Sequence, residues 1–140
     1  MGKRARVVLD TVDAPGLRFV SRFESGAELP LAGTSGRDGA SPVEAVLAAL
    51  GGCTGMDVIS ILRKKRQAVT GYEVVVEGQR RAEHPRVFTR IEIVHRLRGP
   101  SLKAAAIEEA IRLSDTKYCS VHAMLAHGAE ITSRYEILRA

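Results

Sequence analysis

The sequence contains no tryptophan and only three phenylalanines and three tyrosines in 140 residues, so leucine, isoleucine, valine and alanine must supply its core. It also lacks a long apolar run. The longest, Ala45 to Met56, is too short to span a bilayer and is followed by Asp57. The basic start MGKRARVVLD does not lead into the apolar segment of a secretory signal. We therefore expect a cytoplasmic protein of one domain, residues 1–140, with no membrane partner.

Charge of one sign is not concentrated along the chain. The 21 basic and 16 acidic residues give a net charge of +5 that is spread over the whole sequence. The densest basic patch, Arg63 to Arg66, is typical of the last turn of a helix, where positive charge interacts favourably with the helix dipole. The sequence Gly52-Cys53-Thr54-Gly55 matches the G-x-x-G of KH domains, but its flanks are apolar and its centre carries no positive charge. Nucleic acid is therefore not an expected partner.

Cysteine is scarce as well, since the chain has only Cys53 and Cys119. In a reducing compartment such a pair is not expected to form a standing structural bridge, whereas a transient or catalytic pairing is compatible with it. Cys119 begins a predicted short helix, where backbone N–H groups and the helix dipole favour a thiolate. Cys53 lies mid-helix in the apolar stretch GGCTGMDVIS. Periodicity alone leaves a second interpretation open, in which both thiols pack as small hydrophobic groups.

Turn and alternation signals predict strands in the N-terminal third of the chain. The expected strands cover residues 4–12, 17–23 and 27–33, with a turn signal at 13–16. Pro30 places the third strand at the edge of its sheet, because proline cannot donate a ladder hydrogen bond. The segment is therefore predicted to be a meander.

A long helix is predicted over residues 41–66. Ser41 is the expected N-cap, Pro42 the first helical residue, and Glu44 the partner of Ser41 in a capping box. Apolar residues on both sides of the pattern predict a helix that is buried on both sides. Three glycines between positions 51 and 55 each cost about 1 kcal/mol relative to alanine, which the close approach of another helix would offset.

The rest of the chain predicts a hairpin of strands 72–78 and 87–97 around His84-Pro85, a helix from Pro100, a short helix over about 119–126 and a final strand over 130–138. Asp115 and Thr116 are expected to be cap and turn residues before the short helix, or alternatively polar residues that line a substrate pocket. Strands, helix, hairpin, helices and strand in this order predict an α+β fold rather than repeated βαβ units.

The segment SPVEAVLAALGGCTGMDV, followed after a hairpin and a helix by SDTKYCSVHAML, resembles the OsmC/Ohr family of osmotically inducible and organic hydroperoxide resistance proteins. The resemblance spans nearly the whole chain and is closer to the OsmC-like branch than to the well-studied peroxidases. It implies antiparallel sheets packed around central helices in an intertwined homodimer, with two active sites at the subunit interface.

The resemblance also implies a reaction that needs no metal, haem or flavin cofactor. Cys53 would attack an organic hydroperoxide and become a sulfenic acid, and Cys119 would condense with it to a disulfide that a dithiol reductant reopens. The apolar surroundings of Cys53 favour organic peroxides over hydrogen peroxide.

The residues that would activate the thiol depart from the family pattern. In the family's peroxidases a glutamate directly follows the proline, ten residues before the cysteine, whereas here Val43 follows Pro42 and Glu44 lies nine residues before Cys53. Nine residues at about 100° each amount to roughly 900°, so Glu44 and Cys53 face opposite sides of a regular helix. Glu44 is therefore either a catalytic residue or only a capping one.

An arginine from the N-terminal strands also holds the thiolate in the family's peroxidases. Arg18 and Arg22 share one face of the second predicted strand, and Arg37 in the following loop is a third candidate. For each of them the alternative is a charge that faces solvent.

Two further interpretations remain. Cys119, His122 and His127 are close in sequence but do not have the spacing of a closed zinc site, so we expect no metal. His122 is more simply a hydrogen-bond partner of Cys119, or a cation beside its thiolate.

The alternative to an enzyme is an OsmC-like dimer that binds a small apolar ligand or a partner, with both cysteines structural.

Overall fold

The computed structural model describes residues 1–10, 16–33 and 38–139. They form two compact units, Met1–Val46 and Leu47–Ala140, each of which is described by itself. Most of the turn predicted at 13–16, and Arg37, lie outside the described residues.

The N-terminal unit is built on an antiparallel sheet. Its strands, in the order β1-β2-β3, are β1 (Ala5–Leu9), β2 (Arg18–Phe23) and β3 (Glu28–Ala32). The predicted meander is confirmed, and Pro30 lies in an edge strand. Gly26 makes the turn between β2 and β3 with a φ of 93°, a left-handed conformation that glycine adopts without strain.

Helix α1 (Pro42–Lys64) begins with the predicted capping box. The Glu44 N–H donates to Ser41 Oγ at 3.2 Å, and the Ser41 N–H donates to Glu44 Oε1 at 3.2 Å. Two of the backbone donors that have no partner within the helix are thereby satisfied. The helix ends in Arg63 and Lys64, as the basic patch predicted.

One stripe of α1 is fully buried, and its members are four residues apart: Leu50, Thr54, Val58 and Leu62. The other side is not, since Met56 is 73% exposed. The prediction of burial on both sides is therefore wrong for the single chain, because one sheet covers only one side of the helix. By length and composition α1 alone among the described helices could cross a membrane, a test that the core helix of a soluble protein also passes.

The glycines of α1 fit against a strand. A Cβ at Gly51 would lie 3.1 Å from Val76 Cγ2, and one at Gly55 would lie 3.3 Å from Val74 Cγ2. Both valines belong to β4, so the predicted close approach of a helix is wrong and a strand takes its place. At Gly52 an added Cβ would meet no described atom within 4 Å.

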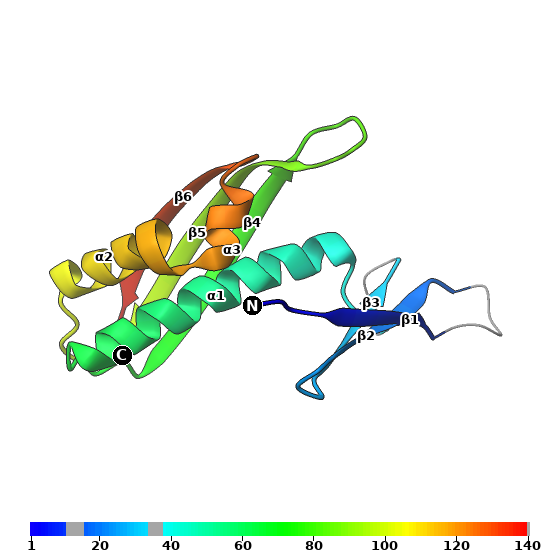
Figure 1. Cartoon of the computed structure of the whole chain (residues 1–140). Helices are drawn as coiled ribbons and strands as arrows, with labels where there is room; N and C mark the ends of the chain where they lie inside the picture. Colours follow the sequence, from blue (N-terminus) through cyan, green and yellow to red (C-terminus); the bar gives the residue numbers. More distant parts are fainter. Residues whose placement is uncertain (11–15, 34–37, 140) are drawn as a thin grey trace. The chain divides into compact units, whose positions relative to one another are not determined.

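The C-terminal unit has a mixed sheet of β4 (Gly71–Arg80), β5 (Phe88–Arg98) and β6 (Glu130–Leu138). β4 and β5 form the predicted antiparallel hairpin, whereas β6 runs parallel to β5. The α+β class is thus confirmed, but this sheet is not purely antiparallel. A single crossover joins β5 to β6, and its helices lie with α1 on one face of the sheet (Figure 1).

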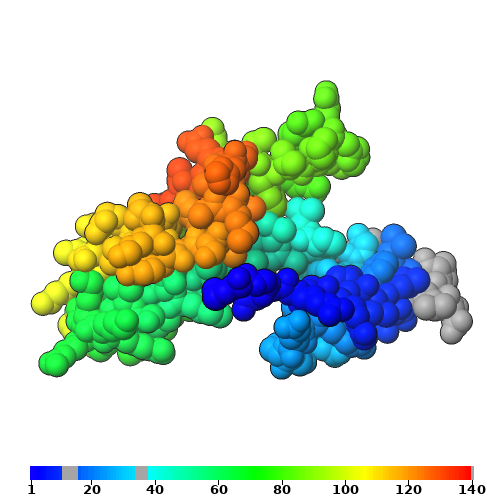
Figure 2. Space-filling model, in the orientation of Figure 1, coloured from blue at the N-terminus to red at the C-terminus, as the bar shows by residue number. Residues whose placement is uncertain are grey.

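The crossover contains α2 (Ala104–Leu113), the π-helical turn η1 (Ser114–Tyr118) and α3 (Ser120–Leu125). In Figure 2 the atoms of these segments, yellow to orange, lie against the green atoms of α1. Asp115 and Thr116 were predicted to be cap and turn residues, but they lie within η1, which continues α2 without a break. Cys119 itself is the N-cap of α3.

The interior of the C-terminal unit consists of two apolar clusters. Along α1, Leu50 belongs to one cluster and Val58 to the other, with Thr54 between them. We call the fully buried polar residues Thr54, His95 and Ser114 the polar layer. On β5, His95 likewise separates Ile93 from Leu97, which belong to different clusters.

Candidate active site

The two cysteines, 66 positions apart in the sequence, come together in the C-terminal unit. The sulfurs of Cys53 and Cys119 and a carboxylate oxygen of Asp57 all lie within 4.8 Å of one another. Cys53 and Asp57 share a face of α1 because they are four residues apart. Cys119 reaches the same place from the N-cap of α3.

The two thiols differ in their access to solvent. Cys119 is 4% exposed and belongs to the apolar cluster of Leu50, Ile91 and Ile93. Cys53 packs against the same cluster but is only half-buried. A reagent from solution therefore meets Cys53 more readily.

Cys119 is a protonated thiol in this environment. Burial, the neighbouring Cys53 and the charge of Asp57 raise its pKa well above the ordinary value. The His122 N–H donates to Cys119 Sγ at 3.3 Å, which favours the thiolate but does not offset the other effects. The prediction of a thiolate at this helix start is wrong, because the helix is short and the sulfur lies in an apolar cluster.

Asp57 is held in place from the crossover. Ser114 Oγ donates to Asp57 Oδ2 at 3.0 Å and is 2.8 Å from Thr54 Oγ1. Sequence reasoning missed all three residues as parts of the site. The four-residue spacing puts Asp57 on the same helix face as Cys53 but does not by itself mark it as a site residue, and the position of Ser114 depends on the π-helical turn.

A second polar pair lies on the sheet. Tyr72 Oη is 2.6 Å from His95 Nδ1, and burial lowers the pKa of His95 to about 4. His95 is therefore neutral and is hydrogen-bonded to the tyrosine hydroxyl. Burial and the charges of Asp115 and Asp57 raise the pKa of Tyr72, so its hydroxyl stays protonated.

The histidines suggested as metal ligands are placed differently from the sequence pattern. His122 Nε2 is 3.8 Å from Asp115 Oδ1, and the contact of His122 with Cys119 comes from its backbone. His127 is exposed beyond the end of α3. Among the described residues, the group that could hold a metal is instead Cys53, Asp57 and Cys119, whose sulfur and carboxylate donors suit Zn²⁺ once the thiols are deprotonated.

The other candidate residues lie in the N-terminal unit. Arg18 forms an ion pair with Asp10 and donates to the Asp38 carbonyl. Arg22 Nε donates to Glu28 Oε2 at 2.7 Å. Glu44 forms the capping box, so its structural role is confirmed, and a catalytic role of Arg18, Arg22 or Glu44 stays a prediction.

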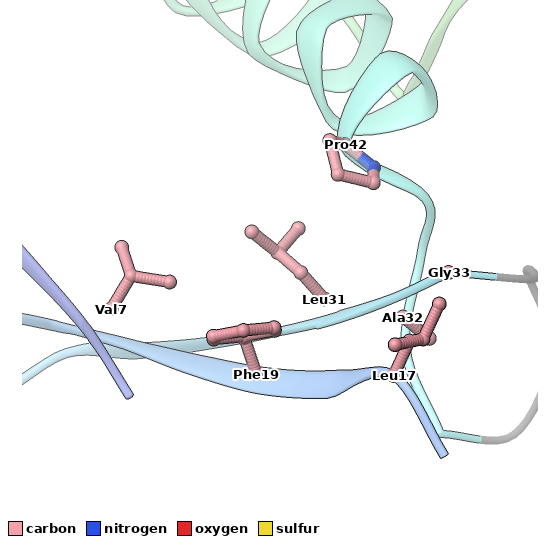
Figure 3. Close-up of a pocket in the computed structure, with 7 residues that line it drawn as sticks. All are labelled: Val7, Leu17, Phe19, Leu31, Ala32, Gly33 and Pro42. Atoms are coloured by element: carbon pink, nitrogen blue, oxygen red, sulfur yellow. The ribbon is translucent and has the colours of Figure 1, made fainter. Parts of the chain in front are cut away.

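The N-terminal unit also contains an open apolar pocket of about 320 Å³. Val7, Phe19 and Leu31 line it from the three strands of the sheet, together with Pro42 at the start of α1 (Figure 3). Its remaining lining residues are Leu17, Ala32 and Gly33.

The sequence and the fold both match known proteins. The sequence model of the family described as OsmC-like protein matches residues 33–134. Protein YhfA of Escherichia coli (strain K12) is 45% identical over 125 residues, which cover 89% of this chain and 93% of that protein.

Solved structures of other proteins also resemble this fold. A hypothetical protein from Aquifex aeolicus VF5 is 31% identical, with a TM-score of 0.87 over 100% of this chain and 98% of that one. An organic hydroperoxide resistance protein OsmC from Legionella pneumophila is 11% identical and shares the fold, with a TM-score of 0.65 over 97% of each chain. From the family match and the identity to YhfA, this chain belongs to the family of OsmC-like proteins.

Proposed function

We propose that this protein reduces organic hydroperoxides with its two thiols, as part of the cell's defence against oxidative stress. The observation that carries the proposal is the approach of the Cys53 and Cys119 sulfurs to within 4.8 Å. A small movement of side chains brings such a pair to the bond length of a disulfide. Proteins named for organic hydroperoxide resistance from Legionella pneumophila and Bacillus subtilis share the fold, which agrees with this chemistry.

The proposed reaction has three steps. Cys53 attacks the peroxide, so that the O–O bond breaks and Cys53–SH and ROOH give Cys53–SOH and ROH. The Cys119 thiol then displaces the hydroxyl of Cys53–SOH, which gives a disulfide and water. An external dithiol reduces the disulfide to the two thiols and is itself oxidised to a disulfide.

The environments of the thiols support this order of roles. Cys53 is the more accessible sulfur, as a group that meets a substrate must be. Cys119 is buried and protonated, so it is inert toward the peroxide and positioned to react only with its neighbour. The apolar cluster around both sulfurs favours a substrate with an apolar group over hydrogen peroxide.

The proposal includes a homodimer, in a cytoplasmic protein whose 140 residues act as one domain. Large apolar side chains are exposed both on the N-terminal sheet, such as Val7, and on α1, such as Met56. A second copy that covers these surfaces would remove them from water. An arginine, Arg18 or Arg22, would reach the thiol of one subunit from the other.

The test is the fate of the thiols under cumene hydroperoxide. Reduced protein is treated with one equivalent, and free thiols and intact mass are followed with time. We expect loss of two thiols and of 2 Da per chain in the wild type, no oxidation in Cys53→Ser on the same time scale, and in Cys119→Ser a persistent sulfenic acid that dimedone traps. Wild-type thiols that do not react would refute the proposal.

The apolar pocket of about 320 Å³ in the N-terminal unit favours one other function, the binding of a small apolar ligand without chemistry. In that case both cysteines are structural, and the same experiment separates the two. Unreactive thiols, together with retention of an apolar fluorescent probe that Phe19→Glu abolishes, would support binding alone.

A further inference from the structure

Asp57 is the charged side chain that lies against both sulfurs of the candidate site. One of its carboxylate oxygens is within 4.8 Å of each sulfur, which is near enough for direct contact after a small side-chain rotation. Its negative charge raises the pKa of Cys119, so it does not act by stabilising a thiolate. A carboxylate that destabilises a neighbouring thiolate can still accept the proton of the thiol as its sulfur reacts.

The hydrogen bonds around Asp57 keep one of its oxygens occupied. Ser114 Oγ donates to Oδ2 at 3.0 Å, and Ser114 Oγ and Thr54 Oγ1 are 2.8 Å apart in the buried polar layer. This contact fixes the orientation of the carboxyl group from η1, a segment remote in sequence. The carboxylate as a whole stays within reach of the two sulfurs, with which it can exchange a proton.

Other titratable groups lie around the site. Tyr72 of β4 keeps its hydrogen and is hydrogen-bonded to His95. Asp115 of η1 is 3.8 Å from the His122 ring of α3, and it is not a member of the group whose atoms all lie within 4.8 Å of one another. Both chemical steps of the proposed cycle take a proton from a thiol, and Asp57 is the acceptor placed beside both thiols.

We propose that Asp57 is the proton carrier of the two-thiol cycle. In the first step it accepts the proton of Cys53–SH as sulfur attacks, and it donates that proton to the leaving RO⁻ to give ROH. In the second step it accepts the proton of Cys119–SH as the disulfide forms, and it donates that proton to the leaving hydroxide to give water. Ser114 is the positioning residue for this carboxylate.

The inference rests on the proposed function, and single-turnover rates test it. Formation of the sulfenic acid and closure of the disulfide are followed separately by stopped flow and by quenching with a thiol reagent, with EDTA present because the three groups could bind a metal. We expect Asp57→Asn to slow both steps by about 100-fold or more, the usual range for loss of a general acid–base group. Its remaining rates should rise in proportion to hydroxide concentration between pH 7 and 9, more steeply than those of the wild type.

A matched control is Glu109→Gln, which removes an exposed carboxylate from α2 and should leave both rates unchanged. In Asp57→Ala, added formate should restore part of the rate, because it supplies a carboxylate that the alanine leaves room for. Equal rates in wild type and Asp57→Asn would overturn the inference while leaving the peroxidase proposal intact, whereas an inactive wild type would refute the peroxidase proposal itself.

A wild-type measurement covers the case in which the variants do not fold. Proton transfer to Asp57 during disulfide closure predicts a slower closure in D₂O than in H₂O. An equal or faster closure in D₂O would mean that Cys119 reacts as a preformed thiolate, and would contradict the role of Asp57.

Discussion

Buried polar side chains at single positions interrupt the apolar interior of the C-terminal unit. Thr54 and Ser114 satisfy each other, and Ser114 also satisfies Asp57. His95 Nδ1 is hydrogen-bonded to Tyr72, while its Nε2 has no hydrogen-bond partner among the described residues. Because a buried polar group without a partner is costly, each of these residues makes the stability of the fold sensitive to substitution, and His95 makes it sensitive to protonation as well.

His95 predicts a loss of stability in mild acid. Its pKa in the folded protein is about 4, below the ordinary 6.5, so the unfolded chain binds a proton first as the pH falls. The stability that depends on a neutral His95 is fully present above pH 6.5 and is lost as the pH falls toward 4. At 1.36 kcal/mol per pKa unit, the free energy of unfolding decreases by roughly 3 kcal/mol over this range. Urea unfolding under reducing conditions at pH 7.5 and pH 5 should show about 2 kcal/mol of this loss, because pH 5 lies about 1.5 units below 6.5.

The histidine variants check this assignment. His95→Gln should be less stable at pH 7.5 but should lose less stability than the wild type between the two pH values. His127→Gln, at an exposed position, should follow the wild type. If His95→Gln and wild type lose the same free energy, another group causes the acid sensitivity.

The sequence revealed only part of the site. Both cysteines were identified from the sequence because each lies in a segment that resembles the family. Asp57 did not, because a carboxylate one turn from a cysteine is common on helices and becomes informative only when Cys119 is placed beside it. The roles of Arg18, Arg22 and Glu44 depend on how one unit meets the other unit or a second chain, which no local pattern encodes.

Among the elements, those with local signals were predicted best. The capping box at Ser41, the alternation along β5 and the hairpin between β4 and β5 depend on residues close in sequence. The parallel pairing of β6 with β5 and the π-helical turn η1 were missed, since both arise from contacts between distant segments. The glycines of α1 were noticed, but their partner was a strand rather than a helix.

The junction between β5 and α2 depends on Gly99. A Cβ there would overlap the Ala68 carbonyl oxygen, a backbone atom that cannot rotate away, and would press on Leu102. We expect Gly99→Ala to lower the free energy of unfolding by about 1–3 kcal/mol, as overpacking does. Gly128→Ala is the matched control, because a Cβ there meets no described atom within 4 Å, and its urea midpoint should stay near that of the wild type.

At the scale of the whole molecule, the exposed apolar side chains need an explanation. Met56 on α1 is 73% exposed, and Val7 on the N-terminal sheet is 51% exposed. Phe19, on the strand beside β1, is 36% exposed and lines the apolar pocket. Side chains of this size on one chain are typical of surfaces that a partner covers, in agreement with the proposed homodimer.

The dimer predicts a specific effect of charge on α1. Sedimentation velocity at micromolar concentration should give a dimer for the wild type and a monomer for Met56→Glu, because a carboxylate cannot be buried there without a partner. Val87→Glu, at a 48% exposed position in the hairpin loop, should remain dimeric. A monomeric wild type would contradict the homodimer.

The π-helical turn has a consequence for how this chemistry can be gained or lost. In η1 the Cys119 N–H bonds to the Ser114 carbonyl, five residues back, so the turn holds one residue more than an α-helical turn. Removing one residue, such as the exposed Lys117, would restore ordinary winding and rotate Cys119 and the start of α3 by about 100°. A chain could thus retain both cysteines and still be unable to form the disulfide between them. A single-residue deletion could therefore abolish the two-thiol reaction while leaving both cysteines in the sequence.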